Sequence, residues 1–162
     1  MKRKGFTLVE LLIVIAVLGA LTAMMTLSST NAAGAAKAAS IINGLQTLRT
    51  AVQVYVAENS AGAPIVGVIN AEDTTKSTGF LAVSGDYIDK ATFDKIKGKY
   101  TVVEGTDTPK GWYAGYAVGT TDTNTINKLK DRATEDGLLG AANGTTPYTG
   151  GDSQATVYMR VH

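Results

Sequence analysis

The apolar positions of this 162-residue chain fall into two regions with different spacing. Near the amino terminus, the apolar stretch at residues 6–27 includes residues 11–21, where no side chain is polar. A helix needs roughly 20 residues to cross the hydrocarbon core of a bilayer. The pattern therefore predicts a helix that spans a membrane or is buried on all sides.

The helical pattern continues past this stretch, but there only one side of the helix is apolar. Side chains spaced three or four residues apart form one stripe: Ala38, Ile41, Leu45, Leu48, Val52 and Tyr55. Gly62 and Pro64 provide a stop, because glycine accepts a left-handed cap and proline cannot continue the helix. A single helix over residues 6–61 would be about 84 Å long.

The rest of the chain consists of short apolar segments separated by Gly, Asp, Asn and Thr. Three of them favour β-strands: residues 100–104, 111–118 and 155–161, the first two joined by a turn. Such strands need a cover for their apolar face, and the helical stripe is the candidate. Shorter helices are expected at residues 125–139 and within 84–97. We therefore predict an α+β fold, in which a long N-terminal helix, transmembrane and then amphipathic, packs against a small antiparallel sheet.

Composition removes most enzyme classes. The chain has no cysteine and a single histidine, His162, which excludes disulfides, thiolate nucleophiles, zinc clusters and histidine-based triads. A net charge of +1 provides no field for a phosphate backbone, so no direct nucleic-acid binding is expected. The acidic residues match no calcium-loop spacing. We expect no catalysis, no cofactor and no metal.

Two local patterns have simple structural interpretations. In a strand, Trp112 and Ala114 face one side and Tyr113 the other, so we expect one side in the core and the other on the surface. Asn143 begins an Asn-Gly-Thr sequence that fits a glycosylation site, but a glycine-bearing turn before Pro147 explains it fully without a glycan.

Positive charge is concentrated at the amino terminus, in Lys2, Arg3 and Lys4. A basic leader before an apolar segment also begins a secretory signal peptide, and these charges should stay on the cytoplasmic side. However, Glu10 lies inside the apolar stretch, and a carboxylate at the centre of a span costs about 2.5 kcal/mol or more. No clear A-x-A cleavage site follows, and the helical pattern continues. These features disfavour an ordinary secretory signal.

The sequence GFTLVELLIVIAVLG at residues 5–19, after a short basic leader, resembles the class III signal and first helix of type IV pilins and pseudopilins. The resemblance directly covers about the first 25 residues. It implies four parts: a leader at residues 1–5, a transmembrane or filament-core half-helix at 6–27, an amphipathic half-helix at 28–62 and a β-rich head at 63–162.

The resemblance implies cleavage between Gly5 and Phe6 by a prepilin peptidase, which also methylates the new amino group of Phe6. Glu10 then takes the place of the glutamate that this family uses for subunit assembly. A physical argument agrees, because a carboxylate in an apolar environment needs a cationic partner. The amine of Phe6, from the same or an adjoining subunit, is the nearest cation that cleavage creates. The alternative is that Glu10 extends to the cytoplasmic headgroups.

The chain departs from many pilins in two ways. They carry a helix-breaking proline at the position that aligns with Leu27, and many close a carboxy-terminal loop with a disulfide. Here polar residues that form helices weakly, including Ser28 and Ser29, follow that position, and Gly19 precedes it. We expect residues 19–31 to stretch or lose helix when subunits pack into a filament. A regular continuous helix in an assembled filament would contradict this.

The function that the resemblance implies is that of a structural subunit of a type IV pilus, a homopolymeric helical filament serving adhesion, motility or DNA uptake. The precursor would wait in the inner membrane for the pilus assembly machinery, and the filament would be extracellular. One alternative is a pseudopilin of a type II secretion or competence system. Another, from a different class, is a singly anchored surface protein whose head binds a ligand.

Overall fold

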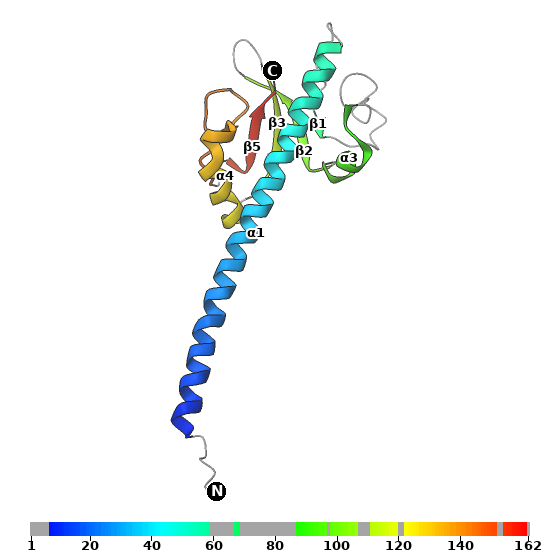
Figure 1. The fold of residues 1–162 in the computed structure, drawn as a ribbon. Helices are drawn as coiled ribbons and strands as arrows, with labels where there is room; N and C mark the ends of the chain where they lie inside the picture. The colour runs from blue at the N-terminus through cyan, green and yellow to red at the C-terminus, as the bar shows by residue number, and fades with distance from the viewer. Residues whose placement is uncertain are drawn as a thin grey trace.

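A computed structural model describes residues 7–58, 67–68, 87–96, 98–106, 111–119, 122–151 and 154–161, without the side chains of residues 27 and 28. These residues form a long helix that carries a small α+β head on its carboxyl-terminal half (Figure 1). The predicted fold class, a long amino-terminal helix against a small antiparallel sheet, is confirmed.

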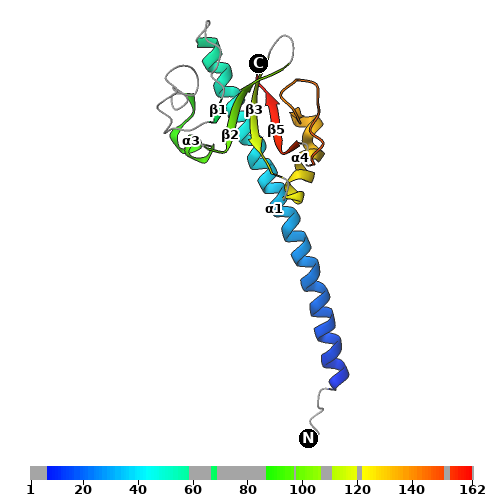
Figure 2. The same ribbon diagram turned by 180° about the vertical axis from the view of Figure 1, so that it is seen from behind.

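The helix α1 (Leu8–Glu58) is continuous over 51 residues. Its first half projects from the head as a stalk, and its second half lies against the sheet in both ribbon views (Figures 1 and 2). The prediction of one helix is confirmed for this range. Gly62 and Pro64, the predicted stop, lie outside the described residues.

Within the described residues, the head contains one five-stranded antiparallel sheet with the strand order β1-β2-β3-β5-β4. Its strands are β1 (Gly67–Val68), β2 (Tyr100–Glu104), β3 (Trp112–Ala117), β4 (Leu138–Leu139) and β5 (Thr156–Arg160). The three predicted strands are confirmed as β2, β3 and β5. The register pairs Val102 with Ala114 and Ala114 with Met159, which sets these three side chains in one row on the same face of the sheet.

In the described part of the chain, two shorter helices flank α1: α3 (Lys90–Ile96) and α4 (Thr123–Asp136). The prediction of a helix at residues 125–139 is wrong at its carboxyl end. Gly137 adopts the left-handed conformation with φ of 65°, and its backbone N–H donates to the carbonyl of Ala133, which ends the helix. The next two residues form β4 and pair with β5.

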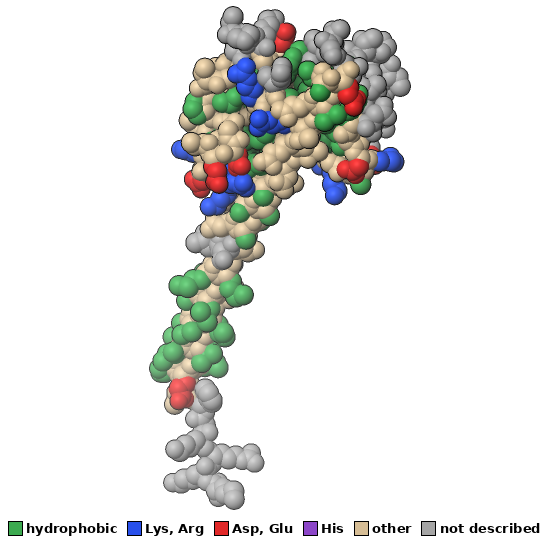
Figure 3. Space-filling view, turned by 45° about the horizontal axis from the view of Figure 1, so that its top comes forward, with side chains coloured by type: hydrophobic (Ala, Val, Ile, Leu, Met, Phe, Trp, Pro, Cys, Tyr) green, Lys and Arg blue, Asp and Glu red, His purple; other side chains and the backbone are tan. Residues whose placement is uncertain are grey.

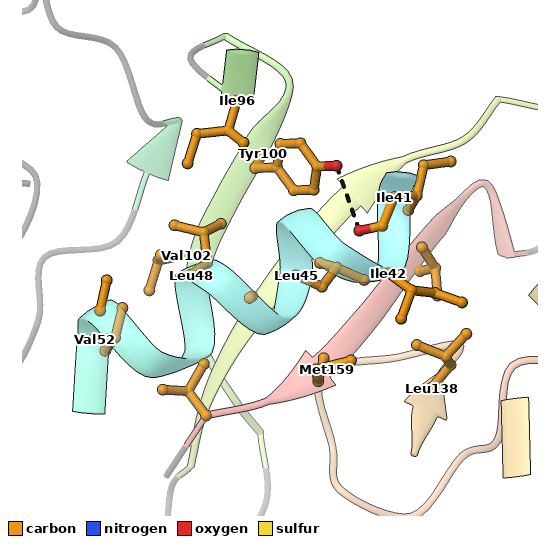
Figure 4. Close-up of a cluster of buried hydrophobic side chains, with 14 of the residues drawn as sticks. Ile41, Ile42, Leu45, Leu48, Val52, Ile96, Tyr100, Val102, Leu138 and Met159 are labelled. Atoms are coloured by element: carbon orange, nitrogen blue, oxygen red, sulfur yellow. Dashed lines mark hydrogen bonds between the residues drawn. The ribbon is translucent and has the colours of Figure 1, made fainter. Parts of the chain in front are cut away.

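The core lies between the stripe on α1 and the sheet (Figure 4). Figure 4 shows Leu45, Leu48 and Val52 of α1 pointing toward side chains of the sheet and of α3, among them Val102 and Ile96. Leu45, Leu48, Val52 and Val102 are all 0% exposed. Burial of each such aliphatic side chain stabilises the fold by roughly 1.5–3 kcal/mol.

The prediction that one side of β3 lies on the surface is wrong, because Tyr113 and Ala114 are both 0% exposed. Tyr113 occupies the face opposite Ala114 on a strand with neighbours on both sides. Val103 of β2 and Arg160 of β5 are its direct cross-strand partners.

Helix α1 approaches β2 most closely at Gly44. A Cβ atom there would lie 2.2 Å from the hydroxyl oxygen of Tyr100 and 2.4 Å from its Cζ. The ring of Tyr100 has little room to move, since it is 4% exposed and its centroid lies 4.8 Å from that of Tyr116. Its hydroxyl donates to the carbonyls of Ser40 and Ile41, each at 3.4 Å. Gly44 is therefore required by packing.

We predict that Gly44→Ala lowers the free energy of unfolding by about 1–3 kcal/mol through overpacking, although alanine favours helix more than glycine does. Gly19→Ala is the matched control, because a Cβ atom there meets nothing within 4 Å. Denaturant unfolding of the detergent-solubilised protein, followed by near-ultraviolet circular dichroism, measures the difference. Equal stability of the two variants would contradict the packing argument.

Candidate functional site

The stalk is an apolar surface that the head does not cover. Its large side chains are between 48% and 79% exposed: Leu8, Val9, Leu11, Leu12, Ile13, Val14, Ile15, Val17, Leu18, Leu21, Met24 and Met25. Figure 3 shows them as a green column on all visible sides of the stalk. The helix is long and apolar enough to cross a membrane, and none of its most apolar stretch is buried. Such a surface needs lipid or other protein chains around it.

The stalk begins with a hydrogen-bonded cap between Thr7 and Glu10. The backbone N–H and the hydroxyl of Thr7 both donate to Oε2 of Glu10, each at 2.8 Å. In return, the backbone N–H of Glu10 donates to the Thr7 hydroxyl at 3.3 Å. The carbonyl of Thr7 accepts the N–H of Leu11, the first bond of the helix. This is a capping box, with threonine at the N-cap and glutamate three residues later.

The cap gives Glu10 a structural role that our sequence analysis missed. The spacing Thr-x-x-Glu just before an apolar run is the signal that could have revealed it. Gly5 and Phe6, the predicted cleavage and methylation residues, lie outside the described residues. Pairing between Glu10 and a Phe6 amine therefore stays a prediction.

The segment expected to lose helix in a filament is helical in the single chain. Residues 19–31, including the backbone at Leu27 and Ser28, belong to α1, and both Gly19 and Ser29 are exposed. The hydroxyls of Thr22 and Thr26 donate to carbonyls four residues earlier, at 2.7 and 3.0 Å, a pattern that slightly destabilises and bends helices. The expected change concerns assembled subunits and stays a prediction.

The contact between α1 and the head that lies nearest to the stalk is here called the junction. It is formed by Gly34, Lys37, Asp122, Asn124 and Thr125. A Cβ atom on Gly34 would lie 2.8 Å from Cβ of Asn124, so the two helices touch there. One turn further along α1, the ammonium of Lys37 pairs with the Asp122 carboxylate. Asp122 also caps α4, because it accepts the backbone N–H of Thr125 at 3.1 Å and its hydroxyl at 2.9 Å.

These contacts shift the pKa values of both Asp122 and Lys37. The hydrogen bond from Lys37, together with those from Thr125, lowers the pKa of Asp122 to about 2. The same hydrogen bond raises the pKa of Lys37 above its ordinary value. The ionised pair and the helix cap therefore stabilise each other.

Above the junction, the structure places the predicted stripe in the buried core. The six residues are between 0% and 7% exposed: Ala38, Ile41, Leu45, Leu48, Val52 and Tyr55. The same helix is thus fully exposed before the junction and buried along one side after it.

The turn at Asn143 is built by its own side chain. Its Oδ1 accepts the backbone N–H groups of Thr145 at 3.2 Å and Thr146 at 3.0 Å, and its Nδ2 donates to the Thr146 hydroxyl at 2.7 Å. Gly144 takes a positive φ of 71°. The amide of Asn143 is therefore engaged in holding the turn.

The comparison with known families bears on the start of the stalk. Residues 1–26 match a family model described as the prokaryotic N-terminal methylation motif, which is characteristic of type IV pilins and pseudopilins. This match confirms the resemblance drawn from residues 5–19. No curated protein and no solved structure matches the chain.

The chain therefore combines an α+β, pilin-like fold with a prepilin-type amino terminus. Such a motif implies processing by a prepilin peptidase and assembly into pilus-like polymers.

The ion pair at the junction predicts that the stability of the head falls at acidic pH. Because the pKa of Asp122 is lower in the folded than in the unfolded chain, its stabilising effect is present at neutral pH and is lost as the pH falls from about 4 toward 2. Asp122→Asn keeps a good helix cap but loses the ion pair, whereas Asp122→Ala loses both and should destabilise the head by about 1 kcal/mol at pH 7. Thermal unfolding in detergent from pH 7 to pH 2 measures both.

The wild type should be more stable than Asp122→Asn at pH 7, and the difference should disappear at the acidic end. A constant difference across this range would show that Asp122 acts through its cap alone.

Proposed function

We propose that the chain is a structural subunit of a type IV pilus, held in the inner membrane through its stalk until cleavage and then assembled into an extracellular homopolymeric filament. The observation that carries the proposal is the continuity of α1. One uninterrupted helix joins an exposed apolar stalk, which bears the methylation motif, to a folded head.

Energetics support bundling of the stalks. Relative to exposure to water, burial of ~1,000 Å² of apolar surface per subunit is a gross gain of about 25 kcal/mol at ~25 cal/mol per Å², before ordering costs, which favours bundled stalks once they are outside the membrane. In the membrane, lipid covers the same surface, so a subunit can exchange lipid for neighbouring stalks. In this proposal the chain itself is not an enzyme, and a separate machine extracts it from the membrane.

The parts of the chain then take distinct roles. Cleavage between Gly5 and Phe6 and methylation of Phe6 generate the mature end, and residues 6–27 enter the filament core. Residues 28–62 hold the head, residues 63–162, on the outside of the filament. The segment from Gly19 to Asn31 adjusts its helix as the subunits pack.

The test is to shear cells of the native host and identify the amino-terminal peptide of the released material by mass spectrometry. We expect abundant chains that begin at N-methylated Phe6. Processed chains confined to the cell envelope would favour a pseudopilin instead. Chains that keep Met1 and occur only in membranes would contradict assembly and favour an anchored binding protein.

A second prediction separates the two roles of Glu10. Glu10→Gln keeps an oxygen that accepts from Thr7 but has no charge for the Phe6 amine, whereas Thr7→Ala removes the hydroxyl and keeps the carboxylate. Since loss of one partner from a buried ion pair costs about 3–5 kcal/mol, Glu10→Gln should reduce sheared filaments at least roughly tenfold. Thr7→Ala should leave most of them.

Quantitative immunoblots of sheared and membrane fractions measure the effect. Both variants should be cleaved and should accumulate normally in the membrane, which is the control for processing. Wild-type filament yield from Glu10→Gln would disprove the charge role, and equal losses in both variants would assign the effect to the start of the helix.

A further inference from the structure

A basic turn lies at the end of α3. Lys95 occupies the last turn of this helix, and Lys99 directly precedes β2, with a third lysine, Lys97, between them in the sequence. Lys95 and Lys99 are both exposed. Gly98 makes the reversal possible with a φ of 72°, and the backbone N–H of Lys99 donates to the carbonyl of Ile96 at 3.1 Å. The two described lysines are thus held close together by the backbone.

This turn lies at the end of the head from which the stalk leaves. Lys95 lines a cleft together with Ala36 and Ala39, which come only a few residues after the exposed stalk. Tyr100, next to Lys99, reaches the carbonyls of Ser40 and Ile41. Figures 1 and 2 show the turn from α3 into β2 at this lower edge of the head, beside α1.

The turn carries more positive than negative charge, although Asp89, just before α3, interacts electrostatically with Lys95. Lys37, on the same edge, pairs with Asp122, and Lys90 pairs with Asp94 at 3.4 Å. No ion pair to Lys95 or Lys99 occurs among the described residues. Once Asp89 is set against Lys95, the described residues at this edge keep an excess of one positive charge, that of Lys99.

The geometry of α1 sets the distance between this edge and a membrane. Residues 8–25, at 1.5 Å per residue, cover about 27 Å and fill the ~30 Å hydrocarbon core. Ser40, whose carbonyl Tyr100 reaches, lies about 23 Å beyond Met25, and the headgroup layer occupies roughly 5–8 Å of this distance. The turn stands on the order of 15 Å from the headgroups when the helix is upright, about one and a half Debye lengths. An average tilt of about 20° toward α3 brings it closer.

We propose that Lys95 and Lys99 form a docking surface for anionic phospholipid headgroups, which tilts the membrane-anchored subunit onto its α3 side. The proposal rests on the membrane-anchored state in the proposed function. Each basic side chain near an anionic surface favours the docked state roughly fivefold. Two lysines on one short turn can both contact a flat anionic membrane surface. A nucleic acid would need a longer row of basic residues than this turn provides.

The experiment uses the full chain in nanodiscs of phosphatidylcholine alone or with added anionic phosphatidylglycerol. Acetylation of lysine side chains is followed by mass spectrometry. We expect acetylation of Lys95 and Lys99 to slow at least about threefold in the anionic discs. The effect should vanish near 1 M salt, where the Debye length is about 3 Å. Lys130, exposed on α4, is the internal control and should be unchanged.

Matched variants give a second measurement. In the anionic discs, backbone amides of the turn should exchange hydrogen at least about twofold more slowly than in the neutral discs. This lipid dependence should be absent in the double variant Lys95→Gln/Lys99→Gln and present in Lys130→Gln. Because all three side chains are exposed, the folded head should be retained, which circular dichroism checks.

The outcomes separate docking from anchoring. If the amides of residues 8–25 are protected in both kinds of disc but Lys95 and Lys99 react equally, docking is disproved and the anchored state stands. If those amides are unprotected, both proposals fail. Equal protection of the two lysines by duplex DNA added to neutral discs would overturn the assignment to lipid.

Discussion

A single helix has to satisfy two different surroundings, and the rest of the structure follows from this constraint. An α-helix satisfies its backbone hydrogen bonds internally, so α1 can pass from lipid or a bundle of stalks into a folded head without a break. Only its side chains change: they are apolar on nearly every side up to Met25 and apolar mainly along one side after Gly34. The sheet, α3 and α4 are arranged around that one side. The register of β2, β3 and β5 places Val102, Ala114 and Met159 in the row that receives it.

The two principal helices begin with the same chemistry in opposite order. At each start a threonine donates from its backbone N–H and its hydroxyl to a carboxylate three residues away. In α1 the cap is the threonine, Thr7, whereas in α4 the cap is the carboxylate residue, Asp122. The carboxylates differ in their surroundings. Asp122 already has a cation, Lys37, and the bond connects the beginning of one helix to the side of another. In this chain Phe6 is still joined to Gly5, so its nitrogen is an amide and the proposed partner of Glu10 arises only after cleavage.

Regular spacing explains which features were predictable from the sequence. The stripe from Ala38 to Tyr55 and the strands β2, β3 and β5 repeat over several residues, so their patterns could be recognised. The strands β1 and β4 have two residues each, too few to show alternation. Gly137 was a visible stop signal within the predicted helix, and Thr7 with Glu10 formed a visible capping box; both were overlooked. Lys37 and Asp122 are 85 residues apart, and only the packing of α4 on α1 brings them together. Tyr113 is likewise buried on the sheet face opposite Ala114, and a short alternating pattern does not distinguish such a face from an exposed one.

The uninterrupted helix between Glu10 and Ala38 also fixes the rotation of the head about the axis of the stalk. Each residue of an α-helix adds 1.5 Å along the axis and turns it by about 100°. The number of residues between the cap and the first buried stripe position therefore determines which way the head faces around the stalk, as well as how far away it lies. Removal of one residue from the exposed segment before Gly34 would preserve every contact inside the head yet rotate it by more than a quarter turn. The length of this segment thus determines the direction in which the head faces around the stalk. Insertions or deletions there change that direction far more than they change the distance of the head from the cap.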